Sequence, residues 1–143
     1  MHQKYKPKCA FTAGRTEVLA LFSLQPSAFR LRVFGVSQMS AVIVLTTVGA
    51  SFDAARLAQT LVSERLAACV NVLPPMQSIY RWQGQVHVDD ERSLVIKTSS
   101  DQLEALQLRV RALHPYEVPE FLVIDVAGGS QAYLDWLREQ TGT

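Results

Sequence analysis

The chain contains segments in which apolar residues either run continuously or recur with helical spacing. Residues 41–47 form an unbroken, largely β-branched run that Gly49 ends, which is typical of a central strand buried on both faces. After a cap at Ser51 or Asp53, apolar residues recur every three or four positions up to Leu66. This spacing predicts an amphipathic helix that packs on the sheet.

Two further extended segments follow and are separated by a pair of prolines. Residues 68–73 are apolar, and residues 74–75 then mark an edge, bulge or bend, because proline cannot donate to a β-ladder. From Met76 to Val88 we expect a long hairpin arm that reverses at Gly84. Alternation gives this arm an apolar and a polar face. The apolar set is Tyr80, Trp82, Val86 and Val88, and the polar set is Arg81, Gln83, Gln85 and His87.

A second strand and helix repeat the order of the first pair. Residues 93–98 supply the returning strand, and Ser99 with Gln102 forms a capping-box pattern for the helix that follows. The apolar stripe of this helix is regular up to His114. It stops there because Pro115 excludes the helical conformation from the preceding residue.

The last extended segment, residues 121–126, precedes a short helix that Ser130 caps. Two strand-helix-strand halves with helices on one face of an antiparallel sheet predict an α+β, ferredoxin-like sandwich of order βαββαβ plus a C-terminal helix. Nothing in this order covers the other face of the sheet. An apolar sheet face and a long arm must contact something, so we expect self-association.

Composition separates residues 1–38 from residues 39–143. The first segment carries six Lys and Arg side chains against Glu17 alone, whereas the second carries eight basic and twelve acidic ones. Because residues 1–38 lack sustained periodicity, we interpret them as a disordered or non-native leader, with an extra packed element as the alternative. Residues 39–143 form the domain. With its net negative charge, the domain offers no basic face to nucleic acid.

Cysteine usage and hydropathy limit the compartment. Cys9 and Cys69 lie on opposite sides of the change in composition, and Cys69 sits in an apolar run. A disulfide framework is therefore not expected, and a reducing cytoplasm is the default. No window reaches the roughly 18 apolar residues of a membrane span, and no cleavage motif promptly follows the basic start. We expect a cytoplasmic protein with no membrane partner.

Five short strings are weak one by one but specific in their order and spacing. They are residues 66–71 (LAACVN), 78–84 (SIYRWQG), 97–98 (KT), 114–120 (HPYEVPE) and 133–136 (YLDW). Over residues 41–138 the chain resembles the CutA divalent-cation tolerance family. The resemblance implies a homotrimer of ferredoxin-like subunits whose long hairpin arms reach across to neighbours, as in the similar PII proteins. It also implies tolerance to copper and other divalent cations, with no established catalytic activity.

The resemblance also bears on metal binding. Some members have a copper site assigned to a first-strand cysteine and two histidines before the Pro-Tyr pair. Here residues 45–47 contain no thiol and Leu113 precedes His114, so only His114 carries over. We expect weak, poorly selective binding of Cu²⁺ or another divalent cation at inter-subunit sites through His114, Cys69 and Glu120, and no required cofactor. Alternatively, His114 caps its helix as a cation and Cys69 is a core hydrophobe.

Two charged positions have both a structural and a ligand-binding interpretation. His87 precedes the acidic residues 89–91, which either hold a hard cation weakly or form a solvated turn. Lys97 interrupts an apolar strand and requires a partner. It therefore forms an ion pair or contacts an anion. Glu91, Glu117 or Glu120 could supply the partner at a subunit boundary.

The aromatic residues and the absence of catalytic motifs bear on which functions are possible. Four aromatic residues are expected in the subunit interface in preference to a ligand-stacking box: Tyr80, Trp82, Tyr133 and Trp136. One rival function is a PII-like sensor that binds a metabolite in an inter-subunit cleft, and another is a structural trimer that anchors a protein. The cleft candidates are Lys97, Tyr116, Glu120, Glu117 and Glu91. No CxxC, HExxH, GxSxG, P-loop or Rossmann pattern occurs, so we do not expect an enzyme.

Overall fold

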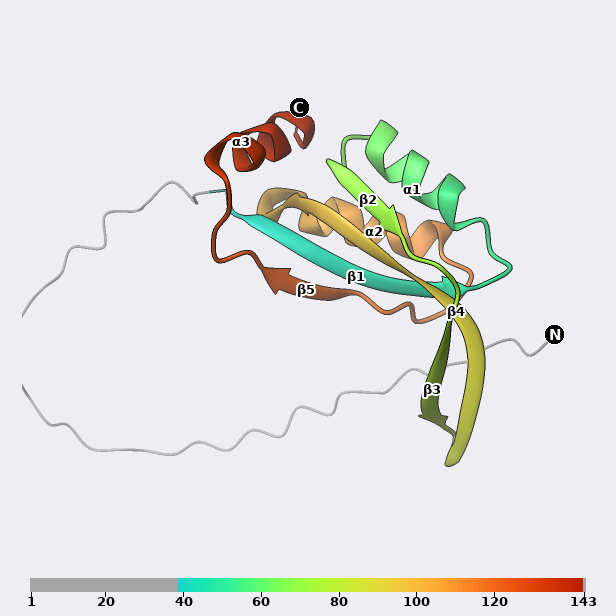
Figure 1. Cartoon of the computed structure of the whole chain (residues 1–143). Helices are drawn as coiled ribbons and strands as arrows, with labels where there is room; N and C mark the ends of the chain where they lie inside the picture. Colours follow the sequence, from blue (N-terminus) through green and yellow to red (C-terminus); the bar gives the residue numbers. More distant parts are fainter. Residues whose placement is uncertain (1–38, 143) are drawn as a thin grey trace, which may run out of the picture. The chain divides into compact units, whose positions relative to one another are not determined.

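The computed structural model describes residues 39–142, so the leader predicted for residues 1–38 lies outside the described residues. The elements are β1 (Ala41–Gly49), α1 (Ala54–Ser63), β2 (Cys69–Val72), β3 (Met76–Trp82), β4 (Gln85–Ser99), α2 (Leu103–Leu113), β5 (Leu122–Asp125) and α3 (Gln131–Gln140) (Figure 1). A short 3-10 turn, Ser100–Gln102, joins β4 to α2. The predicted α+β class is confirmed, and the arm strand β3 adds a fifth strand to the predicted order βαββαβ plus a C-terminal helix.

A single antiparallel sheet organises these elements. Its strand order is β2-β4-β1-β5, and β3 pairs with residues 85–91 of β4 to form the arm. β1 pairs with β4 along its whole length, from Ala41 opposite Ser99 to Gly49 opposite Glu91. The other edge of β1 pairs with β5, so β1 is central, as predicted.

Alternation along β1 divides the sheet into two different faces. The even-numbered residues Val44 and Val48 are buried together with Leu94 of β4. Leu61 of α1 and Leu106 of α2 cover them from the helix layer, and all five side chains are essentially inaccessible to solvent. Odd-numbered residues of β1 therefore point to the opposite face of the sheet.

The helix α3 packs on that opposite face, at one end only. Leu137 is buried against Ala41 and Ala68, and the hydroxyls of Ser99 and Thr141 are hydrogen-bonded at 2.9 Å. The sequence pattern had left this face entirely uncovered. The same contact explains why the predicted capping box does not form, since the Ser99 side chain bonds to Thr141 and not to the helix start.

Beyond α3 the same face, here called the open face, presents apolar side chains. In one row across the sheet Ile43 lies between Lys97 and Ile124, and Cys69 of β2 pairs with Lys97. In the next row Leu45 lies between Val95 and Leu122. Leu122 is 55% exposed and Ile124 is 48% exposed. Within residues 39–142 nothing covers these two rows as the helices cover the other face.

The arm reverses at Gln83 and Gly84, as predicted. Both residues have positive φ, 48° and 80°, which is the conformation of a two-residue type I′ turn. The turn places Trp82 opposite Gln85. Simple alternation does not continue through such a turn, so even-numbered residues of β3 share a face with odd-numbered residues of β4.

The two faces of the arm therefore differ from the prediction. Tyr80 and Trp82 share a face with His87, not with Val86 and Val88, and the predicted apolar set is wrong. The other face of the arm is open to solvent and mixes the polar residues Gln77, Arg81 and Asp90 with aliphatic ones. It carries Ile79, Val86 and Val88, which are 70%, 63% and 57% exposed.

The strand β4 runs unbroken from Gln85 to Ser99 and so joins the second half of the predicted arm, residues 85–88, to the returning strand predicted for residues 93–98. The acidic residues 89–91 lie inside this strand, so their interpretation as a solvated turn is wrong. Asp89 lies opposite Ser78, and Glu91 lies between Met76 of β3 and Gly49 of β1. Alternation within a strand sends successive carboxylates to opposite faces, and this placement brings Glu91 next to the end of β1.

Two buried threonines lie on the helix-covered face, and we expect replacement by valine to change the free energy of unfolding in opposite directions at the two positions. Thr46 Oγ1 has no hydrogen-bond partner among residues 39–142, whereas Thr98 Oγ1 donates to Leu66 O at 2.8 Å. Thr46→Val should raise the free energy of unfolding by about 1 kcal/mol, because it removes a desolvated hydroxyl. Thr98→Val should lower it by about 1–3 kcal/mol, because it leaves a buried carbonyl unpaired. Denaturant unfolding at one fixed protein concentration measures both; a loss of stability in Thr46→Val would contradict this.

Candidate functional site: the pocket between arm and sheet

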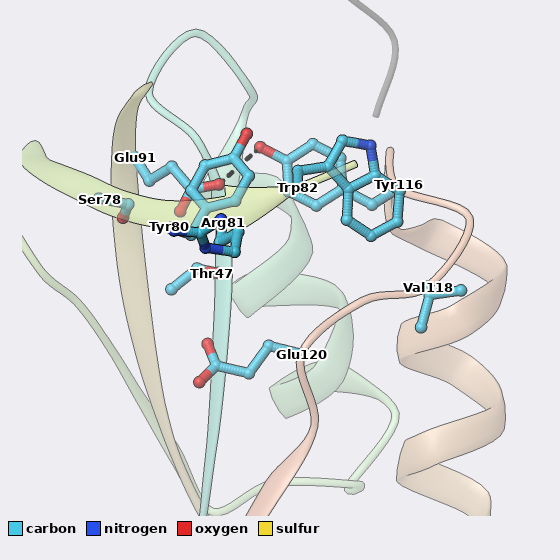
Figure 2. Close-up of a pocket in the computed structure, with 9 residues that line it drawn as sticks. All are labelled: Thr47, Ser78, Tyr80, Arg81, Trp82, Glu91, Tyr116, Val118 and Glu120. Carbon is cyan, nitrogen blue, oxygen red and sulfur yellow. Dashed lines mark hydrogen bonds between the residues drawn. The ribbon is translucent and has the colours of Figure 1, made fainter. Parts of the chain in front are cut away.

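A pocket of about 440 Å³ lies where the arm, the end of β1 and the loop between α2 and β5 come together (Figure 2). Each of these segments supplies part of the lining. The lining residues are Thr47, Ser78, Tyr80, Arg81, Trp82, Glu91, Tyr116, Val118 and Glu120. The set contains three aromatic rings, two carboxylates and one guanidinium group.

His114 fixes the start of the α2–β5 loop. Its side chain is buried, with Nε2 2.9 Å from Thr47 O and Nδ1 accepting from Tyr116 N–H at 3.0 Å. These partners require the neutral ring with its proton on Nε2. Both ring nitrogens are thus engaged, and a metal ion can bind the ring only after one of the two bonds breaks.

Tyr116 and Glu91 form the innermost contact of the pocket. The Tyr116 hydroxyl donates to Glu91 Oε1 at 2.9 Å, and Glu91 is only 4% exposed (Figure 2). Burying a carboxylate is unfavourable unless hydrogen bonds replace its water. This bond supplies one such partner and ties the loop to the arm.

A second phenol lies on the β3 side of the pocket. The Tyr80 hydroxyl donates to Asp89 Oδ2 on the same face of the arm. The Tyr80 ring stacks on His87, with centroids 5.6 Å apart and planes 18° apart. Of the acidic run, Asp89 and Glu91 share the face of His87, whereas Asp90 lies on the other face.

The structure gathers only some of the predicted site residues. Glu91, Glu120, Tyr116, Tyr80 and Trp82 line the pocket. The predicted interface pair on α3 is not part of it. That pair is Tyr133 and Trp136, whose rings are 5.2 Å apart and whose side chains are 43% and 38% exposed.

Lys97 lies away from the pocket, beside Cys69. Its Nζ is 3.9 Å from Cys69 Sγ across the β2–β4 pair. Along β4, Lys97 is four residues from Ser93, which pairs with Thr47 at the pocket, a separation of roughly 13 Å. Within one chain this distance separates Lys97 from the pocket that Glu91 and Glu120 line, and the pairing of Lys97 with Glu91, Glu117 or Glu120 at a subunit boundary stays a prediction.

The predicted metal ligands are separated for the same reason. His114 contacts the end of β1 near the pocket, whereas Cys69 sits at the far row of the open face. No group of three or more His, Cys, Asp and Glu side chains in the described part of the chain is arranged to hold a metal ion. Nor is any helix in that part long and apolar enough to cross a membrane.

Sequence reasoning missed four residues of the pocket: Thr47, Ser78, Arg81 and Val118. Ser78 had a usable signal, because it precedes Tyr80 and Trp82 at a spacing of two and so shares their face. Thr47 had none, since only the pairing of β1 with β4 brings it next to the arm.

The sequence profile of the family described as CutA1 divalent ion tolerance protein matches residues 42–140. The chain belongs to the CutA1 family. This confirms the resemblance predicted from the five strings, and the profile covers every element of the sheet.

Several CutA1 relatives align over most of the domain. The divalent-cation tolerance protein CutA of Thermus thermophilus is 52% identical over 100 residues, which cover 70% of this chain and 97% of the relative. The chloroplastic protein CutA of Arabidopsis thaliana is 36% identical over 139 residues, covering 92% and 76%. The crystal structure of CutA1 from Oryza sativa superposes with a TM-score of 0.70 at 42% identity, covering 72% of this chain and 94% of that one.

Replacing His114 tests its structural role in this CutA1 chain. His114→Ala should lower the free energy of unfolding by about 1–3 kcal/mol, because Thr47 O and Tyr116 N–H lose their shared partner. His87→Ala is the matched control, since that ring stacks on Tyr80 at the surface of the arm. Chemical denaturation of both variants checks the prediction. Equal losses would mean that the two backbone bonds of His114 contribute little.

Proposed function

We propose that this CutA1 chain is a divalent-cation tolerance protein that acts as a homotrimer of ferredoxin-like subunits and binds divalent metal only weakly. The names of its relatives support the cation-tolerance role. The proposed compartment is the cytoplasm, because Cys69 is a free thiol. The protein is proposed not to be an enzyme, in line with the missing catalytic motifs.

The open face is the observation that carries the trimer proposal. The strand order β2-β4-β1-β5, with α1 and α2 on one side, fits the ferredoxin-like pattern and leaves two apolar rows uncovered beyond α3. Exposed apolar area of this kind favours burial against a second copy. Three chains that bury these rows and their arms would reach the size of obligate interfaces, on the order of 2,000 Å² or more per contact.

A charge placed on the open face should break the assembly. Light scattering of the wild type should give three times the chain mass, and the mass should persist at micromolar concentration. Leu122→Asp should shift the protein toward monomer, because Leu122 is 55% exposed on this face. Leu108→Asp is the control, since Leu108 is 64% exposed on α2 in the helix layer. A monomeric wild type, or dissociation by the control alone, would contradict the proposal.

Weak metal binding follows from the donors that remain. The imidazole of His114 is engaged at both nitrogens, and the Cys69 thiol lies 3.9 Å from the Lys97 ammonium, which repels a cation. Carboxylates such as Glu120 are left, and oxygen ligands give copper little preference over other divalent ions.

Copper titration tests whether binding is weak and independent of the Cys69 thiol. Calorimetry should give a Cu²⁺ dissociation constant weaker than about 1 μM. Cys69→Ser should leave the affinity unchanged. Nanomolar binding that Cys69→Ser abolishes would show that the thiol is the principal ligand.

The pocket supports a second candidate function, a sensor or carrier of a small molecule. Its volume of about 440 Å³ falls in the range of ligand sites, and its lining combines aromatic rings with a few polar groups. The buried carboxylate of Glu91 is the feature that favours this function most, because buried charge is costly and concentrates at binding sites.

A further inference from the structure

Lys97 places an ammonium group in the middle of the open face. It lies on β4 between Ile43 of β1 and Cys69 of β2, and the same row continues to Ile124 of β5. The side chain is half-buried, and its Nζ lies 3.9 Å from Cys69 Sγ. A thiol is only a weak acceptor, so this contact does not compensate the positive charge. No carboxylate among residues 39–142 forms an ion pair with Lys97.

Glu120 places a carboxylate at the other end of the same side of the sheet. It lies two residues before Leu122, which pairs with Leu45 on the open face, and it lines the pocket together with Thr47 (Figure 2). The side chain is half-buried. No basic side chain in the described part of the chain forms an ion pair with it.

An apolar row separates these two opposite charges. The row consists of Leu45, Val95 and Leu122. Lys97 lies four strand positions, or roughly 13 Å, from the end of the sheet at which Glu120 lines the pocket. An ion pair needs an N···O separation of about 4 Å or less. One chain therefore presents a positive group and a negative group on either side of an apolar strip, too far apart to pair with each other.

Burial of the open face makes an unpaired charge unfavourable. The assembly proposed above removes water from the apolar rows, and Lys97 lies within one of them. A buried charge costs free energy unless an opposite charge or hydrogen bonds replace its water. A second copy that covers Ile43 and Leu45 must therefore bring an acceptor to the Lys97 ammonium.

The other carboxylates on this side of the molecule fit that requirement less well. Asp89 and Glu91 accept hydrogen bonds from the phenols of Tyr80 and Tyr116. Glu117 is exposed on the α2–β5 loop and does not line the pocket. Glu120 alone among these four carboxylates is both half-buried and placed next to the apolar rows.

We propose that the Lys97 ammonium of one copy pairs with the Glu120 carboxylate of the next copy. This pair rests on the assembly proposed above and names the contact that sets how the copies are arranged. Each copy carries one of the two groups at either end of the strip, so the contact repeats around a closed ring. Figure 2 shows Glu120 apart from Trp82 and Glu91, so a lysine that reaches Glu120 leaves the space between those two side chains open.

Exchanging the two charges tests the pair. Light scattering at micromolar concentration follows the mass of the full chain. Lys97→Glu brings two carboxylates together and Glu120→Lys brings two ammonium groups together, so each should raise the dissociation constant about a hundredfold or more. The double variant Lys97→Glu/Glu120→Lys restores opposite charges with the same combined side-chain length, and it should recover the wild-type mass.

Glu117→Lys is the matched control. It makes the same change three residues away in the same loop, at an exposed position outside the pocket, and it should leave the mass unchanged. Melting curves of each variant check that the chains remain folded. The double variant tests the pair even where a single variant unfolds, because it recovers only if the two positions meet.

An equal mixture of the two single variants separates the pair from the number of copies. In a ring of three built from these two kinds of chain, at least one contact joins like charges, whereas a two-fold dimer of one chain of each kind satisfies both of its contacts. The mixture should therefore recover less assembled protein than the double variant does.

The possible outcomes distinguish the pair from the assembly on which it rests. Dissociation in both single variants with recovery in the double variant supports the pair. A wild-type trimer that neither single variant dissociates, or a double variant that stays dissociated, would overturn the pair and keep the trimer. Dissociation by Glu117→Lys as strong as that by Glu120→Lys would overturn the choice of carboxylate. Full recovery of the mixture as a dimer would keep the pair and overturn the trimer, and a monomeric wild type would overturn both.

Discussion

The pairing of β1 with β4 is the interaction on which the rest of the structure depends. Its antiparallel hydrogen bonds fix which side chains share a face, and a shift by one residue would move Val44 and Val48 out of the core. The same register places Glu91 opposite Gly49 and beside Thr47. The helix-covered core and the position of the pocket are therefore two consequences of one strand pairing.

The odd-numbered residues of β1 all lie on one face of the sheet, but their surroundings differ along the strand. Ala41 lies beneath α3, Ile43 and Leu45 form the open apolar rows, and Thr47 lines the pocket. One end of this face is covered by α3 of the same chain. The middle is apolar and uncovered, and the other end lines the pocket. The apolar rows and the pocket are therefore neighbours on one face of the same strand.

Local periodicity was enough to predict the order of strands and helices, because each element's alternation depends only on its own residues. It failed where partners come from far along the chain. The hydroxyl of Ser99 binds Thr141 and not the helix start, and the turn of the arm moves Tyr80 and Trp82 to the face of the pocket. For the site, the motif around Tyr116 could be predicted, whereas the separation of Lys97 from the carboxylates depends on sheet register.

We propose that the open face mediates assembly while the neighbouring pocket stays available to a ligand. A crystal structure of the full-length protein in its oligomeric state tests this claim most directly. We expect Ile43, Leu45 and Leu122 to be buried by a neighbouring copy and the space between Trp82 and Glu91 to remain open to solvent. A solvent-exposed open face, or a pocket filled by side chains of the neighbouring copy, would contradict it.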